Sequence, residues 1–525
     1  MADYDYSDST LPSLDVGLET FGSRLELVLT ILFHPDTSRI GERSVLPQQE
    51  HAWTLGRNTL AFGRGPHSAR PLGDRHVSRK AVTISRSASS VLLNRSQDSC
   101  RCRVAGVELQ GERELDSATL EQGVSILLAH SVVLLLSLSP PIGDTELPDY
   151  GLRGSSAAMY KLRRQMQQVA PSELDVLLRG ETGTGKEVVA NAIHRASERR
   201  GVPMVSVNVA AIPGSLAPAA LFGSARGAFT GADRARPGYF QQAHEGTLFL
   251  DEIGDAPEEV QPQLLRALQQ SEIQPVGGDI QRVDVRVISA TDAELEGAGA
   301  SFNSALRHRL GALEVCLPPL RQHREDIGEL LHHYLGDALA SQGRGQLLPG
   351  ETQREIAACA ALFHQAACFH WPGNVRQLIN TCSQIAVASD SALQLPLSVS
   401  ALFETPGLER GRDDTREDGA GGEPTATYRS IQEILDEDFD RAMQESCYEV
   451  ARVAQRLGVS RQSVYRRMAS SGVYRKASEL PEPELLDAVR ECGGDTLAAA
   501  QRLRVSASGL RSRLRTGMPS FDNGH

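Results

Sequence analysis

The sequence lacks the features that mark disulfide-stapled, secreted or membrane-spanning proteins. Its eight Cys residues are scattered and form no Cys-x-x-Cys pair, and a chain of 525 residues needs no disulfide staples to fold. The most apolar segment, 125–139, is too short to cross a bilayer and is interrupted by His130. The first residues, Met1–Tyr6, are acidic and polar, unlike a secretory signal. Together these features predict a soluble cytoplasmic protein with free thiols.

The chain also lacks an excess of positive charge. Its formal net charge is −12, so any contact with nucleic acid must come from a local basic region. Hydrophobic residues make up 40% of the chain, which is enough for ordinary packed cores. The length predicts about three or four domains.

Changes in composition and periodicity divide the chain into parts. Short β-type runs separated by turn residues come first: Leu25–Phe33, Val82–Ile84, Val91–Leu93, Val124–Leu128 and Val132–Leu138. A stretch of alternating strand and helix patterns follows, which predicts a parallel sheet with helices on both faces. The later segments have helical periodicity around a polar, glycine-rich linker. We expect a disordered acidic lead (1–20), an all-β sandwich (21–140), a linker (141–149), an α/β subdomain (150–320), a helical lid subdomain (321–402), a second linker (403–428) and an all-α region (429–520).

A glycine-rich segment between a strand-like and a helix-like run carries the strongest chemical signal. Such a turn lets backbone N–H groups converge on phosphate oxygens, and the helix N-terminus adds positive potential. A lysine in this position can reach the β- and γ-phosphates of a nucleotide. The residues of the loop are Gly180, Glu181, Thr182, Gly183, Thr184, Gly185, Lys186 and Glu187. Glu187 replaces the Ser or Thr that usually follows the lysine of a P-loop.

A second segment, 246–252, is an apolar strand that ends in Asp251 and Glu252. Such a strand lies beside the P-loop strand in nucleotide-hydrolysing folds, where the first carboxylate holds Mg²⁺ and the second positions the attacking water. Phosphoryl transfer requires this division between charge neutralisation and activation of the nucleophile. Each motif alone also fits a tight turn or a buried strand. Both motifs, in this order, predict an ATP and Mg²⁺ site.

Residues 150–400 resemble the AAA+ domain of sigma-54-dependent transcriptional activators, the bacterial enhancer-binding proteins. The resemblance is carried, in order, by the P-loop 180–187, Val207–Ala211, the loop 227–232, Gly246–Gly254, Pro318–Ile327 and Trp371–Leu378. The most specific motif is the loop, which in this family protrudes and engages sigma-54. An exposed Phe between glycines offers apolar area to a partner while it remains free to move. The loop residues are Gly227, Ala228, Phe229, Thr230, Gly231 and Ala232.

The resemblance implies roles for further residues. Asn208 would pair with Glu252, and Arg376 on the sensor II helix would contact the nucleotide. Arg309 would reach into the site of a neighbouring protomer, which implies a homo-oligomeric ring because the site of a monomer would be incomplete. The implied activity is Mg²⁺-dependent ATP hydrolysis that remodels sigma-54 RNA polymerase at a promoter.

Three positions depart from the family pattern, and one of them is Ala220, where the family usually has Glu. Asp292, which follows Ala290-Thr291, replaces an Asn and adds a carboxylate near the γ-phosphate. Asn303 stands at the first of two arginine positions. These departures leave open a second hypothesis, a nucleotide-binding scaffold that hardly hydrolyses ATP. A third hypothesis is an AAA+ remodeller of another DNA-bound complex.

The C-terminal part contains an internal repeat and a local basic region. Residues 450–468 align with 496–514 at an offset of 46, and both copies contain Ala-Gln-Arg-Leu-x-Val-Ser. Residues 441–520 hold 14 Lys and Arg against 8 Asp and Glu, the reversal of charge that phosphate contact requires. Both units resemble Fis-type helix-turn-helix segments, whose second helix would enter the major groove of upstream promoter DNA. In the first unit this helix holds Arg461, Gln462, Ser463, Tyr465, Arg466 and Arg467. A helical dimerisation bundle is the alternative.

The N-terminal sandwich resembles a forkhead-associated (FHA) domain, a reader of phosphothreonine in partner proteins. Thr54–Arg57 and His76–Lys80 match its two signatures, so that Arg57, Ser78 and Arg79 would bind one phosphate. Ala81 departs from the family, which has His there. A sandwich kept only for protein contacts is the alternative. We interpret Cys100 and Cys102 as exposed thiols without a metal role.

Overall fold

The computed structural model describes most of residues 25–404 and parts of the chain after residue 435. In the first stretch, residue 48 and the segments 66–67, 88–89, 144–146, 229–233, 294 and 296–301 lie outside the described residues. In the second stretch, the described residues are 436–446, 448, 450–457, 464, 467–468, 474, 480, 482–492, 496–506 and 510. The chain divides into two compact units, Met1–Gly411 and Arg412–His525. The predicted lead and most of the second linker lie outside the described residues, and the predicted domain boundaries stay predictions.

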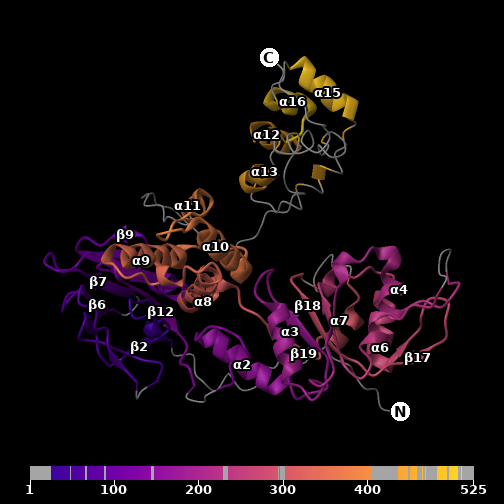
Figure 1. The fold of residues 1–525 in the computed structure, drawn as a ribbon, viewed down its shortest axis with the longest axis horizontal. Coiled ribbons are helices and arrows are strands. Elements are labelled where there is room, and N and C mark those ends of the chain that lie inside the picture. Colours follow the sequence, from indigo (N-terminus) through magenta and orange to yellow (C-terminus); the bar gives the residue numbers. More distant parts are fainter. Residues whose placement is uncertain are drawn as a thin grey trace, which may run out of the picture. The chain divides into compact units, whose positions relative to one another are not determined.

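Two antiparallel sheets form the N-terminal region (Figure 1). One has the strand order β2-β1-β12-β11-β8-β9 and the other β10-β7-β6-β3, while β4 and β5 pair separately. Strands occur at the places of the five apolar runs. The elements are β1 (Glu26–Phe33), β2 (Arg43–Leu46), β3 (Ala52–Leu55), β4 (Ala61–Phe62), β5 (Arg70–Pro71), β6 (Val82–Arg86), β7 (Ser90–Asn94), β8 (Cys102–Val104), β9 (Val107–Glu108), β10 (Glu112–Asp116), β11 (Val124–Leu128), β12 (Val132–Ser139), the helix α1 (Ser117–Gln122) and a 3-10 turn (Thr37–Arg39).

The strands β1, β11 and β12 are buried on both faces. Alternate side chains, such as Leu134 and Leu136, pack into the core between the two sheets. The intervening ones belong to a second apolar cluster that they share with helices far along the chain. The five apolar residues of this outer face are Leu32, Phe33, Leu127, Val133 and Leu135, none more than 3% exposed. Burial of each such side chain contributes roughly 1.5–3 kcal/mol.

One expectation about the N-terminal region is wrong. Cys102 is not an exposed thiol, because it is the first residue of β8 and faces the core between the sheets. Burial raises the pKa of its thiol to about 12, with Cys100 adding to the shift. Cys100 itself is half-buried. Cys102 therefore offers no readily ionised thiol at neutral pH.

A five-stranded parallel sheet with the order β14-β15-β18-β13-β19 forms the next layer. The helices α2 and α3 share one apolar cluster with this sheet, and α4 to α7 share another, so helices cover both faces as predicted. The strands are β13 (Val176–Arg179), β14 (Val205–Asn208), β15 (Thr247–Asp251), β18 (Arg286–Thr291) and β19 (Leu313–Cys316), and a hairpin is formed by β16 (Glu272–Ile273) and β17 (Gln281–Arg282). The helices are α2 (Ala157–Val169), α3 (Lys186–Arg195), α4 (Ala217–Phe222), α5 (Tyr239–Gln242), α6 (Gln261–Gln270) and α7 (Ser304–Leu310).

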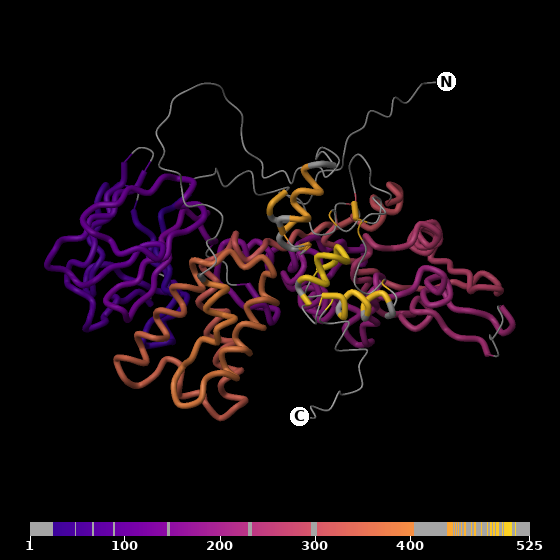
Figure 2. The backbone as a smooth tube through the Cα atoms, turned by 90° about the horizontal axis from the view of Figure 1, so that it is seen from above, coloured from indigo at the N-terminus to yellow at the C-terminus, as the bar shows by residue number. Residues whose placement is uncertain are grey.

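A group of helices, which we call the lid, follows the parallel sheet. It contains α8 (Ile327–Ala340), α9 (Gln353–Cys368), α10 (Asn374–Ala388) and α11 (Leu397–Glu404). Thr352 and Glu355 form a capping box that fixes the start of α9. Trp371 is fully buried in the lid core and donates its indole N–H to the carbonyl of Ala366 at 2.8 Å. The lid shares this core with the outer face of the N-terminal sheet, which is why the orange helices run beside the indigo strands in Figure 2.

The second unit contains four described helices in two small apolar clusters. They are α12 (Asp436–Glu445), α13 (Val450–Leu457), α15 (Glu482–Glu491) and α16 (Thr496–Leu503). The helices α13 and α16 stand at the equivalent first positions of the two sequence repeats. Most residues of the second helix of each repeat lie outside the described ranges, so the helix-turn-helix stays a prediction.

Within the ranges given above, no helix is both long enough and apolar enough to traverse a bilayer. The apolar segment 125–139 instead forms most of β11 and β12, as predicted. Ala129 and His130 make the turn between these strands, with φ angles of 50° and 57°.

Candidate nucleotide-binding site

The glycine-rich loop joins the end of β13 to the start of α3. Gly183 and Gly185 have φ angles of 83° and 99°, which are left-handed values that favour glycine. Gly185 precedes the helix and provides no side-chain cap, and the first N–H groups of an α-helix have no acceptor within the helix. The loop therefore presents backbone donors at a helix N-terminus, an arrangement that binds phosphate.

Lys186 faces the carboxylate predicted to position water. Its side chain is 7% exposed, and its Nζ lies 3.9 Å from Oε1 of Glu252. Lys186 also donates a hydrogen bond to the carbonyl of Gly180 at 2.9 Å. Burial raises the pKa of the Glu252 carboxyl, and the negative charges of Asp292 and Asp251 add to this shift while Lys186 opposes it. The two motifs found in the sequence thus meet at one edge of the sheet.

The few carboxylates at this edge suit Mg²⁺, which takes only part of its ligands from the protein. They do not suit a metal ion that needs all of its ligands from protein side chains. Asp251 is half-buried at the end of β15. Within the described ranges, no group of three His, Cys, Asp or Glu side chains forms a ready metal site. Mg²⁺ commonly takes one or two carboxylates and completes its shell with substrate phosphates and water. The residues present therefore fit a cation that arrives with a nucleotide.

Asp292 lies directly against the P-loop. It follows the end of β18, and its Oδ2 accepts a hydrogen bond from the hydroxyl of Thr182 at 2.5 Å. Its negative charge also acts on the Glu252 carboxyl and adds to the raised pKa of that group. The departure from the family pattern therefore places an extra carboxylate beside both the loop and the predicted water-positioning residue.

Two asparagines of interest serve as helix caps in this structure. Asn208 lies opposite Asp251 in the sheet register, but its Oδ1 accepts from the N–H of Ala211 at 3.2 Å. Its pairing with Glu252 stays a prediction. Asn303, which stands at the first arginine position of the family, accepts from the N–H of Leu306 at 3.0 Å and caps α7.

Arg309 bonds within its own subunit. Its Nε and Nη2 donate to the carbonyl of Leu268 at 3.0 and 2.7 Å, and Nη2 lies 3.6 Å from Asp175. Arg307, the other nearby arginine, donates to Glu314 at 2.8 Å and its side chain is only 11% exposed. The side chain of Arg309 is 39% exposed, so of the two it is the better placed to reach a neighbouring subunit.

The lid holds the P-loop through Glu181. Arg321 donates two hydrogen bonds to its carboxylate, at 2.8 and 2.5 Å. Asn374 donates to Glu181 and to the carbonyl of Thr182, both at 3.1 Å, and accepts from the N–H of Leu320. These contacts lower the pKa of the Glu181 carboxyl, Arg321 most of all.

The start of α10 also contacts the P-loop. The N–H of Arg376 donates to the carbonyl of Gly183 at 3.2 Å, while its side chain is exposed. A side chain at Gly183 would collide with the carbonyl of Gly373. The roles of Arg321 and Asn374 were not found in the sequence, although both lie in motifs that match the family. Each lies close in sequence to a buried apolar residue, Leu320 or Trp371. Local patterns do not connect them to Glu181, which lies 140 residues before Arg321 and 193 before Asn374.

Only the first two residues of the predicted sigma-54 loop are described. Gly227 has a φ angle of 79°, and a side chain there would meet open space. Ala228 lies beside Gly277 in the hairpin region. Phe229, Thr230, Gly231 and Ala232 lie outside the described residues, so the role of the loop stays a prediction.

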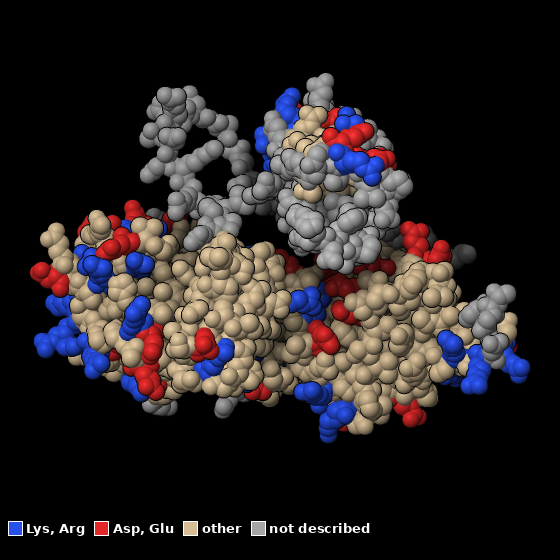
Figure 3. Space-filling view, turned by 45° about the horizontal axis from the view of Figure 1, so that its top comes forward, with Lys and Arg blue, Asp and Glu red and all other residues tan. Residues whose placement is uncertain are grey.

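The two FHA-like signatures meet in space. The N–H of Arg57 donates to the carbonyl of Ser78 at 3.1 Å, and Gly56 packs so closely on the carbonyl of Arg79 that a side chain would not fit. The Ser78 hydroxyl accepts from the N–H of Cys100 at 2.8 Å. Arg57, Ser78 and Arg79 line a shallow pocket of about 630 Å³ together with Arg75, His76, Val77, Lys80, Ser96, Asp98 and Ser99. Figure 3 shows Lys and Arg side chains gathered at the end of the N-terminal region.

Comparisons with known proteins place the ATPase part in a family. The family profile described as "Sigma-54 interaction domain" matches residues 152–316, and that described as "AAA+ ATPase lid domain" matches residues 321–404. The transcriptional regulatory protein ZraR of Klebsiella oxytoca is 36% identical over 364 residues, which are 68% of this chain and 76% of that protein. The chain belongs to the sigma-54-dependent transcriptional activators. The predicted AAA+ P-loop domain with a helical lid is thereby confirmed.

Other relatives match a smaller share of the chain. The DNA-binding transcriptional regulator NtrC of Klebsiella pneumoniae is 44% identical over 264 residues, 49% of this chain. The chain spans about half the length of this relative, 54%. The crystal structure of NtrX from Brucella abortus in complex with ADP is 30% identical and covers 62% of this chain and 70% of that one, with a TM-score of 0.42. Both matching profiles lie within 152–404, so the FHA-like interpretation stays a prediction.

One predicted DNA-contacting residue is described. The guanidinium carbon of Arg467 lies 5.2 Å from the centroid of the Phe439 ring, within the second unit. Arg461, Gln462, Ser463, Tyr465 and Arg466 lie outside the described residues. The DNA-binding role of this helix stays a prediction.

We expect Asp292→Asn to tighten the binding of an ATP analogue roughly tenfold, because it removes a like charge beside the phosphates. The hydroxyl of Thr182 keeps an acceptor in the new amide. Calorimetric titration with Mg²⁺ and a slowly hydrolysed analogue measures the effect. Asp337→Asn, at an exposed carboxylate on α8, is the control and should leave the affinity unchanged. Equal or weaker binding by Asp292→Asn would show that the carboxylate does not oppose the nucleotide.

Proposed function

We propose that the chain is an ATPase that remodels sigma-54 RNA polymerase at promoters. The observation that carries this proposal is the 3.9 Å approach of Lys186 to Glu252 at the mouth of a P-loop. The sigma-54 interaction profile across residues 152–316 supports the choice of partner. ATP and Mg²⁺ are the substrate and the cation that this donor set suits.

The chemistry divides among few residues. The N–H groups at the start of α3 and the ammonium of Lys186 hold the phosphates. Mg²⁺, bound through Asp251, would supply further positive charge to the phosphates. Ionised Glu252 orients the attacking water and accepts its proton. The raised pKa of Glu252 makes it a stronger base, and activity that needs its ionised form is lost as the pH falls through that pKa.

The active state is an oligomeric ring in this proposal. Arg309 would exchange its bonds to the carbonyl of Leu268 for the nucleotide of a neighbouring subunit. Its partial exposure supports this role. An arginine supplied in trans accelerates phosphoryl transfer by up to several powers of ten, so turnover depends on assembly.

A nucleotide-binding scaffold with little hydrolysis is the second candidate. Asn303 caps a helix where the family has an arginine, and Asp292 adds negative charge to the site. Both features favour slow turnover. They do not weaken the case for nucleotide binding, since the P-loop and Lys186 retain their geometry.

Steady-state phosphate release, measured against protein concentration, tests the ATPase. We expect turnover per protomer to rise with concentration as rings form, and Glu252→Gln to lower it by about two powers of ten or more while binding is kept. The exposed carboxylate in Glu258→Gln provides a matched control. Equal turnover in the wild type and in Glu252→Gln would contradict the enzyme and favour the scaffold.

The regions on either side of the ATPase part would bind a signalling partner and promoter DNA. We infer that the N-terminal pocket reads a phosphothreonine segment of a partner protein, since Arg57, Ser78 and Arg79 converge there and three more basic or imidazole groups surround them. The basic C-terminal repeats would bind upstream promoter DNA.

Arg57→Ala should weaken binding of a phosphothreonine peptide about ten- to a hundredfold, because a charge-assisted hydrogen bond to phosphate is lost. Fluorescence anisotropy with phosphorylated and unphosphorylated peptides measures this. Arg86→Ala, at an arginine of β6 outside the pocket, should bind normally. The inference fails if the wild type does not distinguish the two peptides.

A further inference from the structure

The lid covers the outer face of the N-terminal sheet. Helix α9 contacts β1, β11 and β12, and α8 contacts β1. The rings of Phe33 and Phe363 lie 4.8 Å apart between their centroids. At Gly328 the backbone of α8 approaches β1 so closely that an added Cβ would lie 2.5 Å from the carbonyl oxygen of Leu32. The contact is made by buried side chains that belong to one apolar cluster.

His364 adds a directional link in the middle of this contact. Its ring is 4% exposed, and its Nε2 accepts from the N–H of Gly106 at 3.1 Å. The ring proton is therefore on Nδ1 and is donated to the hydroxyl of Ser125 at 2.8 Å. Burial lowers the pKa of His364 to about 4, with a smaller effect from Arg103. The ring is neutral at pH 7, so the hydrogen bonds persist across the physiological range.

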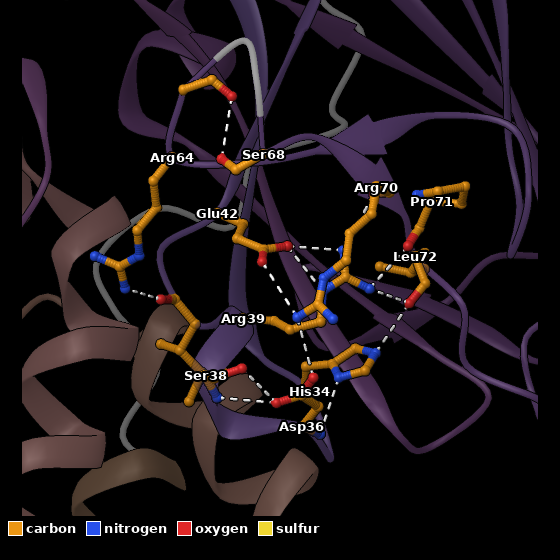
Figure 4. A network of polar contacts seen from close by, with 12 residues as sticks. His34, Asp36, Ser38, Arg39, Glu42, Arg64, Ser68, Arg70, Pro71 and Leu72 are labelled. Carbon is orange, nitrogen blue, oxygen red and sulfur yellow. Dashed lines mark hydrogen bonds and ion pairs between the residues drawn. The ribbon is translucent and has the colours of Figure 1, made fainter.

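Charged groups close the rim of the contact. Arg64 of the N-terminal region pairs with Glu329 of α8 at 3.0 Å, and Figure 4 shows Arg64 pointing toward the lid. Figure 4 also shows the neighbouring bonds of Arg39 and Glu42 that hold the segment in place. Arg43 lies near Glu325 and Asp326, whose charges oppose the lowering of its pKa by burial.

The same lid segment is anchored to the ATPase part. Asp326 is fully buried and accepts from the N–H groups of Ser155 and Ser156 at 2.7 and 2.8 Å, just before α2. The lid thus contacts the N-terminal sheet on one side and the nucleotide-binding subdomain on the other.

We propose that the N-terminal region and the lid are one permanently joined body, so that the N-terminal region moves with the lid and does not act as a detachable, separately tethered sensor. Release would expose the five apolar side chains of the outer sheet face to water. It would also leave Ser125 and the N–H of Gly106 without their partner. Because His364 stays neutral near pH 7, its own titration does not break these hydrogen bonds in that range.

Hydrogen exchange on the full-length chain tests the proposal, with the Gly106 amide as the reporter because it donates to His364. Two glycines of α8 make a matched pair. Gly328→Ala would force the Leu32 backbone away, whereas an added Cβ at Gly336 meets open space. In a helix, alanine is otherwise the more stable residue.

We expect Gly328→Ala to speed exchange at Gly106 about tenfold or more, and Gly336→Ala to leave it unchanged. If Gly328→Ala does not fold, His364→Ala gives the same readout. Wild-type protection at Gly106 should be equal with and without Mg²⁺ and a non-hydrolysable ATP analogue. An unprotected Gly106, identical behaviour of the two glycine variants, or protection lost on adding the analogue would overturn the proposal. The two glycine variants are compared without nucleotide, so the result does not depend on whether the chain binds ATP. Failure of this proposal can therefore be told apart from failure of the proposed ATPase.

Discussion

The ends of β13, β15 and β18 lie side by side because the three strands are parallel neighbours. That single constraint brings Lys186, the Asp251–Glu252 pair and Asp292 to one edge of the sheet, although they are far apart in sequence. Charges gathered in this way perturb one another, which is why burial and two neighbouring carboxylates raise the pKa of Glu252. The proposed chemistry depends on this edge. Without it, the P-loop would have no carboxylates beside it to bind the cation and orient the water.

The lid connects this edge to the rest of the first unit. On one side Glu181 of the P-loop is held by hydrogen bonds from Arg321, whose side chain is 41% exposed, and from the buried Asn374. On the other side the lid packs on the N-terminal sheet through fully buried apolar side chains. Polar contacts near solvent are worth little net free energy, whereas an apolar core of this kind is worth several kcal/mol. The exposed pair of Arg321 and Glu181 is therefore a weaker tie of the lid than the apolar core that the lid shares with the N-terminal sheet.

Local chemistry was predictable from the sequence, and long-range packing was not. The P-loop and the carboxylates of β15 are short motifs whose function lies in their own residues. The runs at 25–33, 124–128 and 132–138 predicted strands at the places of β1, β11 and β12. In the sequence, Asn303 was seen only as the replacement of a family arginine. Its role as the N-cap of α7 appears in the structure, where its side chain accepts from the N–H of Leu306. Cys102 was expected to be exposed, but it begins β8 and faces the core, which depends on the pairing of β8 with β11. The unbroken apolar pattern of β11 and β12 did hint that both faces are buried, but no local pattern identifies α9, some 230 residues later, as the cover.

The most direct test of the account is a crystal structure of the chain with Mg²⁺ and a non-hydrolysable ATP analogue. The account predicts phosphates against the N–H groups at the start of α3 and Lys186, with the cation on Asp251 and Glu252 facing the γ-phosphate. An analogue bound elsewhere, or a P-loop that stays empty at saturating analogue, would contradict it.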